Sequence, residues 1–219
     1  MARVLDVRRL GLIPYADALV LQRSLVEDRR AGRVDDVLLL LEHPHVLTLG
    51  VRRDGGRAHI LATDEALASR GIGVHEAGRG GDVTYHGPGQ IVGYPIIDLN
   101  PDRRDVHRYV RDLETVLIRT AADYGIVAGR VEGLTGVWVG REKLAAIGVR
   151  IAHWITSHGF AINVTTDLDY FSFIVPCGIA DRGVTSLARL LGHPVDAAEV
   201  QNRIIEHFCN TFYLKLLSS

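Results

Sequence analysis

The sequence predicts an α+β fold in which helices flank a mixed β-sheet. Apolar residues recur at helical spacing in several separate stretches, and short β-type runs lie between them. The two kinds of element do not alternate as regular βαβ units, which disfavours a parallel doubly wound sheet. A chain of 219 residues with 47% hydrophobic composition can bury a large share of its surface in one core. We therefore expect residues 1–219 to form a single domain.

Four stretches predict helices. The first covers residues 14 to about 30 and begins behind Pro14, which suits a first helical turn. A short helix over residues 64–71 is stopped by glycine, and a clear apolar stripe over 106–121 ends near residue 124. The last helix begins at Asp196, where an acidic cap precedes Glu199 at the third helical position.

The strand predictions fall between these helices. Residues 37–41 and 46–49 are interpreted as adjacent strands, separated by His43-Pro-His45 and followed by a glycine-rich loop over 52–57. Further strands are expected at 74–77, 83–85, 90–98, 137–139, 144–151 and 155–164. In the last of these, large apolar residues alternate with Gly159, Ala161 and Asn163, so one face packs the core and the other can line a ligand slot.

Composition narrows the function classes. Lys+Arg 25 against Asp+Glu 26 gives a net charge of −1, which disfavours non-specific nucleic-acid binding. No stretch reaches the roughly eighteen uninterrupted apolar residues of a membrane span, and the N-terminus lacks an apolar signal core. We expect a cytoplasmic protein with both cysteines reduced. Cys209 falls among core-spaced residues of the last helix, which favours a buried hydrophobic role.

Two residues are candidates for covalent chemistry. Cys177 follows Pro176 and precedes Gly178, so it is expected at a strand end or turn, where a thiol can meet a reactant. A free cysteine can equally be a small buried hydrophobe. Lys143 begins the returning strand of a hairpin, where a lysine is often only a solvated charge that protects a sheet edge.

A glycine-rich stretch, residues 78–90, is the densest unusual segment. Glycine lets backbone amides approach a ligand closely, so the stretch suits an acyl or phosphate-bearing group. It matches neither nucleotide-binding fingerprint, and a hairpin of tight turns would also explain its glycines. His43 and His45 could join His86 or His158 around a metal, but no recognised zinc spacing is present. We expect no metal and no cofactor.

Together these segments resemble the lipoyl(octanoyl) transferases of lipoate biosynthesis. The resemblance runs from about Leu39 to Leu187, in order and at the family's spacing. The segments that carry it are Arg79-Gly-Gly-Asp-Val-Thr-Tyr-His-Gly-Pro-Gly-Gln90, Gly136-Val-Trp-Val139, Lys143 with Ala146-Ile-Gly148, His158-Gly-Phe-Ala-Ile-Asn163 and Pro176-Cys-Gly178.

The resemblance implies a catalytic domain like that of biotin and lipoate protein ligases, and transfer of an octanoyl (or lipoyl) group from acyl carrier protein to a specific lysine. The acceptors would be lipoyl domains of 2-oxoacid dehydrogenase complexes and the glycine cleavage H protein. Cys177 would form an acyl-thioester and Lys143 would activate it. The substrate pocket implied by the resemblance comprises Arg79, Gly80, Gly81, Asp82, Val83, Thr84, Tyr85, His86, Ala146, Ile147, Gly148, Gly159, Phe160 and Ala161.

Two alternatives remain open. An ATP-dependent lipoate ligase would activate its acid as an adenylate and would need no cysteine nucleophile. A non-catalytic binder of acyl carrier protein would leave Lys143 and Cys177 without a purpose. Thioester exchange followed by amide formation needs no ATP, so the segment around Cys177 separates a transferase from a ligase.

Overall fold

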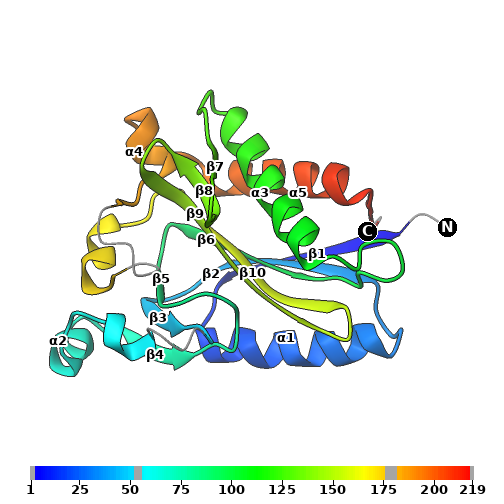
Figure 1. The fold of residues 1–219 in the computed structure, drawn as a ribbon, viewed down its shortest axis with the longest axis horizontal. Helices are drawn as coiled ribbons and strands as arrows, with labels where there is room; N and C mark the ends of the chain where they lie inside the picture. The colour runs from blue at the N-terminus through cyan, green and yellow to red at the C-terminus, as the bar shows by residue number, and fades with distance from the viewer. Residues whose placement is uncertain (1–2, 52–55, 176–181, 218–219) are drawn as a thin grey trace.

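The computed structural model describes residues 3–51, 56–175 and 182–217 of the chain. Its elements form an eight-stranded and a three-stranded sheet with helices packed around them (Figure 1). In chain order the described elements are β1 (Val4–Leu12), α1 (Tyr15–Arg30), β2 (Asp36–Glu42), β3 (Val46–Leu49), η1 (Gly56–His59), α2 (Asp64–Ser69), β4 (Gly73–Glu76), β5 (Thr84–His86), β6 (Gln90–Ile96), α3 (Val106–Ala122), β7 (Gly129–Val131), β8 (Leu134–Val139), β9 (Glu142–Ala152), β10 (Ile155–Asn163), η2 (Leu168–Phe173), α4 (Leu187–Leu191), α5 (Ala197–Phe212) and β11 (Lys215–Leu216).

The larger sheet is mixed. Its strand order is β11-β1-β2-β6-β10-β9-β8-β7, and β1 runs parallel to both β11 and β2. The remaining neighbours, from β2 through β6, β10, β9 and β8 to β7, are antiparallel. The smaller sheet has the order β4-β3-β5. A mixed sheet with flanking helices confirms the predicted α+β class.

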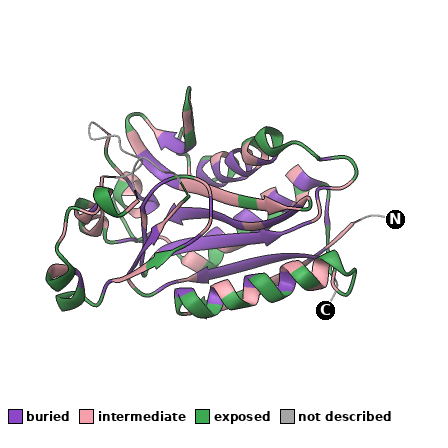
Figure 2. Ribbon diagram, turned by 60° about the horizontal axis from the view of Figure 1, so that its bottom comes forward, coloured by how far each residue is buried: buried purple, intermediate pink, exposed green. Residues whose placement is uncertain are grey.

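Helices cover both faces of the larger sheet. In Figure 1, α3 and α5 lie on one side and α1 on the other. Leu38 of β2 belongs to the core under α3 and α5, whereas its neighbour Leu39 packs in the core under α1. Because both faces of β2 are covered, its sequence is a continuous apolar run rather than an alternating one. Figure 2 shows the strands buried and the outer face of α1 exposed.

The predicted helices are confirmed, as are the predicted strand segments. The Asp196 side chain accepts a hydrogen bond from the Ala198 amide at the start of α5, as expected for a cap. β1, β7, β11 and α4 were not predicted. In β1 the register shifts between Arg9 and Gly11, and Gly11 has φ +63°, so the chain lacks the regular alternation by which a strand is recognised.

The prediction that residues 37–41 and 46–49 form adjacent strands is wrong. Both strands exist, but β2 pairs with β1 and β6 in the larger sheet, whereas β3 pairs with β4 and β5 in the smaller one. His43, between them, is fully buried and hydrogen-bonded to the Ile13 carbonyl and the Tyr94 hydroxyl. These contacts hold the chain where it leaves one sheet for the other.

Two further sequence expectations concern α5 and membrane spans. Cys209 lies on α5, half-buried against the core, and burial raises the pKa of its thiol. This agrees with a packing role. Among the described residues, no helix is long and apolar enough to cross a membrane.

Candidate active site

A cavity of about 410 Å³ lies where the two sheets meet. Its volume falls within the range of about 300–1,000 Å³ that is typical of small-molecule sites. The smaller sheet contributes β5 and the loop before it, and the larger sheet contributes β6, β9 and β10. Lys143 lines the cavity, as does every expected pocket residue except Tyr85. These residues are Arg79, Gly80, Gly81, Asp82, Val83, Thr84, His86, Ala146, Ile147, Gly148, Gly159, Phe160 and Ala161.

Arg79 is the buried cation of the glycine-rich loop. Its guanidinium donates to the carbonyl and hydroxyl of Thr48, at 2.7 and 2.8 Å, and to the Asp82 carbonyl at 2.8 Å. The loop also pairs with β9, because the Gly80 amide donates to the Val149 carbonyl at 2.9 Å. A Cβ at Gly148 would lie 2.9 Å from the Gly80 carbonyl oxygen, so this approach requires glycine.

Asp82 fixes the outer side of the same loop. Its carboxylate accepts from the Gly56 amide at 2.8 Å and makes a very short contact with the His59 ring. Burial alone would raise the pKa of Asp82, but these hydrogen bonds and one from the Val83 amide hold it below its ordinary value. Asp82 therefore acts as an ionised anchor for the loop.

A chain of buried side chains joins this loop to the strand that carries Lys143. His86 Nδ1 lies 2.7 Å from Gln90 Oε1, and Gln90 Nε2 donates to Asn163 Oδ1 at 2.9 Å. Asn163 Nδ2 in turn donates to the Thr185 carbonyl at 2.9 Å, and the Thr185 amide donates to the Lys143 carbonyl at 3.0 Å. Since Gln90 Nε2 donates to Asn163, the oxygen Gln90 Oε1 faces His86 and accepts a hydrogen bond from His86 Nδ1–H.

Lys143 is 9% exposed and is held from two directions. Its amide donates to the Gly183 carbonyl at 2.9 Å, which joins β9 to the residues just before α4. Its ammonium lies 4.7 Å from the ring centroid of Trp138, the cross-strand neighbour on β8. The guanidinium carbon of Arg182 lies 5.4 Å from the same centroid.

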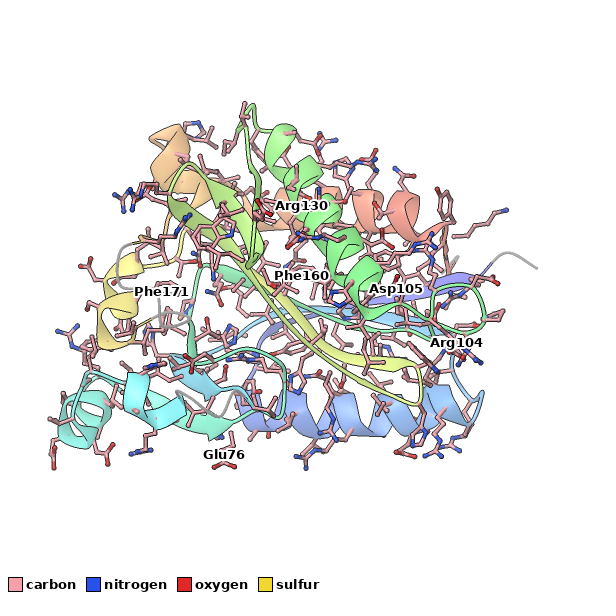
Figure 3. The ribbon with its side chains drawn as sticks, in the orientation of Figure 1. Glu76, Arg104, Asp105, Arg130, Phe160 and Phe171 are labelled. Carbon is pink, nitrogen blue, oxygen red and sulfur yellow. The ribbon has the colours of Figure 1, made fainter. Side chains whose placement is uncertain are left out.

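Cys177 falls in residues 176–181, outside the described residues. The chain lines the cavity on both sides of this interval, through Phe171 before it and Val184 after it. On the earlier side, the Val175 amide donates to the His59 carbonyl at 2.9 Å. Figure 3 shows Phe171 on η2, with Phe160 of β10 nearer the centre of the fold.

Tyr85 is the one described pocket residue that lies outside the cavity lining. Its ring lies between neighbouring rings, at centroid distances of 6.1 Å from His45 and 5.2 Å from Tyr170, with nearly parallel planes. Its hydroxyl lies 2.8 Å from His45 Nδ1. The structure therefore places Tyr85 where it supports η2, which leads toward residues 176–181.

Gly159 lines the cavity, but glycine is needed there because β10 packs closely against β6. A Cβ at this position would lie 2.2 Å from the Gly93 carbonyl oxygen on β6. The next residue, Phe160, packs in the core under α3 and α5, and Ala161 packs in the core under α1. Glycine at 159 therefore allows β10 and β6 to approach closely.

The hairpin that carries Trp138 is anchored by a buried carboxylate. Glu114 of α3 is fully buried and accepts from Arg130 Nε at 2.8 Å and from Arg111 at 2.7 Å. Its other oxygen accepts from the Gly136 amide at 3.1 Å. Gly136 has φ +121°, and a Cβ there would lie 2.6 Å from the Ala145 carbonyl oxygen. These contacts hold β8 against β9 next to Lys143.

Sequence reasoning did not assign several polar and aromatic residues of the cavity. They come from distant segments, and no local motif joins them. Tyr15 at the start of α1 is 4% exposed, and its hydroxyl has no hydrogen-bond partner among the described residues. Burial raises its pKa to about 12, so the phenol is neutral. The unassigned polar and aromatic lining residues are Tyr15, Tyr94, Thr135 and Phe171, whereas Gln90, His158 and Asn163 belong to segments that the sequence had already singled out.

Three comparisons place this architecture among known proteins. A family model described as the lipoyl protein ligase A/B catalytic domain matches residues 14–209. An octanoyltransferase from Solibacter usitatus is 54% identical over 211 residues, which is 96% of this chain and 94% of that protein. The bi-partite lipoate protein ligase of Thermoplasma acidophilum, studied with its E2 lipoyl domain, has a TM-score of 0.73 at 18% identity, covering 100% of this chain and 87% of that chain. A biotin protein ligase from Aquifex aeolicus in complex with biotin has a TM-score of 0.52 at 12% identity, covering 95% and 70%. The two structural matches concern the fold, and they confirm the ligase-like architecture that the sequence resemblance implied.

Proposed function

Since the chain belongs to the lipoyl protein ligase A/B catalytic domain family, with an octanoyltransferase 54% identical to it over 96% of its length, we propose that it is an octanoyltransferase. It is an acyltransferase that moves an octanoyl (or lipoyl) group from acyl carrier protein to a lysine of a lipoyl domain. One observation carries the residue assignment. Lys143 lines the cavity together with Phe171 and Val184, which flank Cys177 in the sequence.

The first half-reaction is thioester exchange on Cys177. A free thiol is only a few per cent thiolate at neutral pH, and a nearby ammonium increases that fraction. Lys143 supplies this charge. The thiolate attacks the acyl carbonyl, the carrier's thiolate leaves, and one thioester replaces another at little cost in free energy. Backbone amides stabilise the oxyanion formed on the way.

The second half-reaction forms an amide. The amine of the acceptor lysine attacks the acyl-enzyme carbonyl, and the bond to the Cys177 sulfur breaks. The amine must lose a proton, and Lys143 accepts it as a neutral amine, because in the first half-reaction its ammonium gave a proton to the carrier's departing thiolate. An amide is more stable than a thioester, so the transfer proceeds without ATP.

The cavity provides the acyl site. Its walls include the small residues Ala146 and Gly148 of β9 and Ala161 of β10, with Val92 and Ile147 nearby. Each methylene that is buried there contributes about 0.8 kcal/mol, so the length of the dry part of the cavity sets the preferred chain length. The loop over residues 79–86 closes one side of this site through the contacts of Arg79 and Asp82.

The carrier substrates follow from the same assignment. The donor is octanoyl-acyl carrier protein, and the acceptors are lipoyl domains of 2-oxoacid dehydrogenase complexes and the glycine cleavage H protein. We propose further that residues 1–219 act as one catalytic domain, since strands of both sheets line the cavity. No metal or cofactor takes part in the proposed steps.

The rival activity is ATP-dependent ligation of lipoate. The likeness to a lipoate ligase structure at 18% identity concerns the fold, and fold alone does not separate a transferase from a ligase. The presence of a Pro-Cys-Gly segment between two cavity-lining residues favours the transferase.

Intact-mass measurement tests the proposal. Mixing the protein with octanoyl-acyl carrier protein in the absence of ATP should add one octanoyl group, mapped by peptide analysis to Cys177. Cys177→Ser should abolish the adduct and the turnover, whereas Cys209→Ser should retain both, since Cys209 packs on α5. An adduct on Cys209, or transfer that requires ATP, would refute the transferase assignment.

A further inference from the structure

Two cations, one of them Lys143, lie close to the ring of one buried tryptophan. Trp138 is 3% exposed and lies directly across from Lys143 in the β8–β9 register. The Lys143 ammonium is 4.7 Å and the Arg182 guanidinium carbon 5.4 Å from the ring centroid. Both distances lie within the roughly 6 Å over which an aromatic face attracts a cation.

The indole is itself held rigidly. Its strand is fixed to α3 by the bond from the Gly136 amide to Glu114, and β8 pairs with β9. Trp138 Nε1 is buried and makes no hydrogen bond within the part of the chain that the structure describes. The side chain therefore interacts with nearby cations through its π face. Among the aromatic residues, tryptophan attracts cations most strongly in this way.

A lysine ammonium must be confined by its neighbours if it is to stabilise a charge at one fixed position. Its ammonium sits on a flexible four-carbon stem, and a point charge stabilises a thiolate only when it stays within a few ångströms. Arg182 is the first described residue after the interval that contains Cys177. The ring thus holds the ammonium next to the residues that follow this interval.

We propose that Trp138 is a positioning residue, whose indole face sets the place of the Lys143 ammonium for chemistry at Cys177. The inference rests on the proposed function insofar as Lys143 serves Cys177. In this proposal Trp138 acts through Lys143 and not on the reacting atoms. It acts by limiting the positions of Lys143, with Arg182 seated on the same ring.

A spectroscopic test needs no activity. Lys143 and Lys215 are the chain's two lysines, so protein labelled with ¹³C at the lysine ε-carbon gives two signals. Ring current should move the Lys143 ε-proton signal upfield of the exposed Lys215 signal, and Lys143→Arg assigns it by deleting it. Trp138→Leu should abolish the upfield shift, Trp138→Phe should retain part of it, and the matched control Trp154→Phe should leave it unchanged.

The kinetic test compares the same variants in a single turnover with octanoyl-acyl carrier protein. Trp138→Leu should slow acylation about tenfold, equivalent to about 1.4 kcal/mol, whereas Trp138→Phe, which keeps an aromatic face, should stay within about threefold of the parent. A packing role alone would lower thermal stability in both variants without this rescue.

The outcomes distinguish the positioning role of Trp138 from the proposed transfer chemistry at Cys177. Coincident lysine signals in the parent protein, or equal slowing by Phe and Leu at equal stability, would overturn the positioning role. If Trp138→Leu does not fold, the parent signal and the Phe variant still decide. A normal upfield signal without any adduct on Cys177 would refute the proposed function and leave the Lys143–Trp138 contact standing.

Discussion

Three buried histidines next to the cavity should make the fold sensitive to mild acid. Burial lowers the pKa of His43 to about 4, that of His86 to about 3 and that of His158 to about 4. Their hydrogen bonds suit neutral rings. His43 Nδ1 donates to the Ile13 carbonyl, while its Nε2 accepts from the Tyr94 hydroxyl. Protonation would remove that acceptor and place a charge in the core.

The magnitude follows from linkage between protonation and folding. In the unfolded chain a histidine titrates near pKa 6.5, so at about pH 5.5 all three histidines are mostly protonated when the protein is unfolded. In the folded protein the same three rings are mostly neutral at that pH. Because the unfolded state binds more protons, stability falls as the pH falls. Each histidine should lose about 1.4 kcal/mol between about pH 7.5 and 5.5, and the three together about 4 kcal/mol. The loss continues as the pH approaches the folded-state values near 4.

Urea unfolding at several pH values measures this loss. His43→Gln should reduce the acid-induced loss by about one third, because one of three proton-linked groups is gone. His107→Gln, an exposed substitution on α3, should leave the loss unchanged. Stability that does not change between about pH 7.5 and 5.5, or an equal loss in the His43 variant and the parent, would refute the assignment of buried neutral histidines.

Two further predictions concern the polar chain and the acyl site. Asn163→Ala removes a buried side chain that is hydrogen-bonded to both Gln90 and the Thr185 carbonyl. Urea unfolding should therefore show a free energy of unfolding lower by about 1–3 kcal/mol. An unchanged midpoint would show that this series of hydrogen bonds does not stabilise the fold. Ala146→Ile adds volume to the cavity wall and should slow octanoyl transfer by much more than butanoyl transfer, since each lost methylene contact is worth about 0.8 kcal/mol. If both acyl groups are slowed alike while the melting temperature is unchanged, Ala146 does not face the acyl chain.

Most of the helices and strands were predictable because each of these has its own local signal. The apolar stripe over 106–121 and the Asp196 cap are read from consecutive residues, and both match α3 and α5. The pairing of β3 with β4 and β5 was not predictable in the same way, because nothing near His43 says which sheet the chain enters next. Register between distant strands depends on contacts that a single sequence does not show.

The same limit applies to the candidate site. The glycine-rich loop and Lys143 were identified because they belong to compact motifs, and the structure brings both to one cavity. Tyr15 and Trp138 were not assigned, because an aromatic residue in an apolar stretch is ordinarily part of the core. Their significance rests on neighbours far away in sequence, such as Arg182 on the Trp138 ring.

The hydrogen bonds of the site link its two halves into one unit. Arg79 donates to the Thr48 hydroxyl, which lies 3.5 Å from His86 Nε2. From His86 the chain of buried bonds continues through Gln90 and Asn163 to the backbone that pairs with Lys143. Buried polar groups are costly to leave unpaired, so a displacement of the loop over residues 79–86 would break bonds on the Lys143 side as well. The position of the loop that carries Arg79 and the position of the backbone at Lys143 are therefore coupled through this network of buried hydrogen bonds.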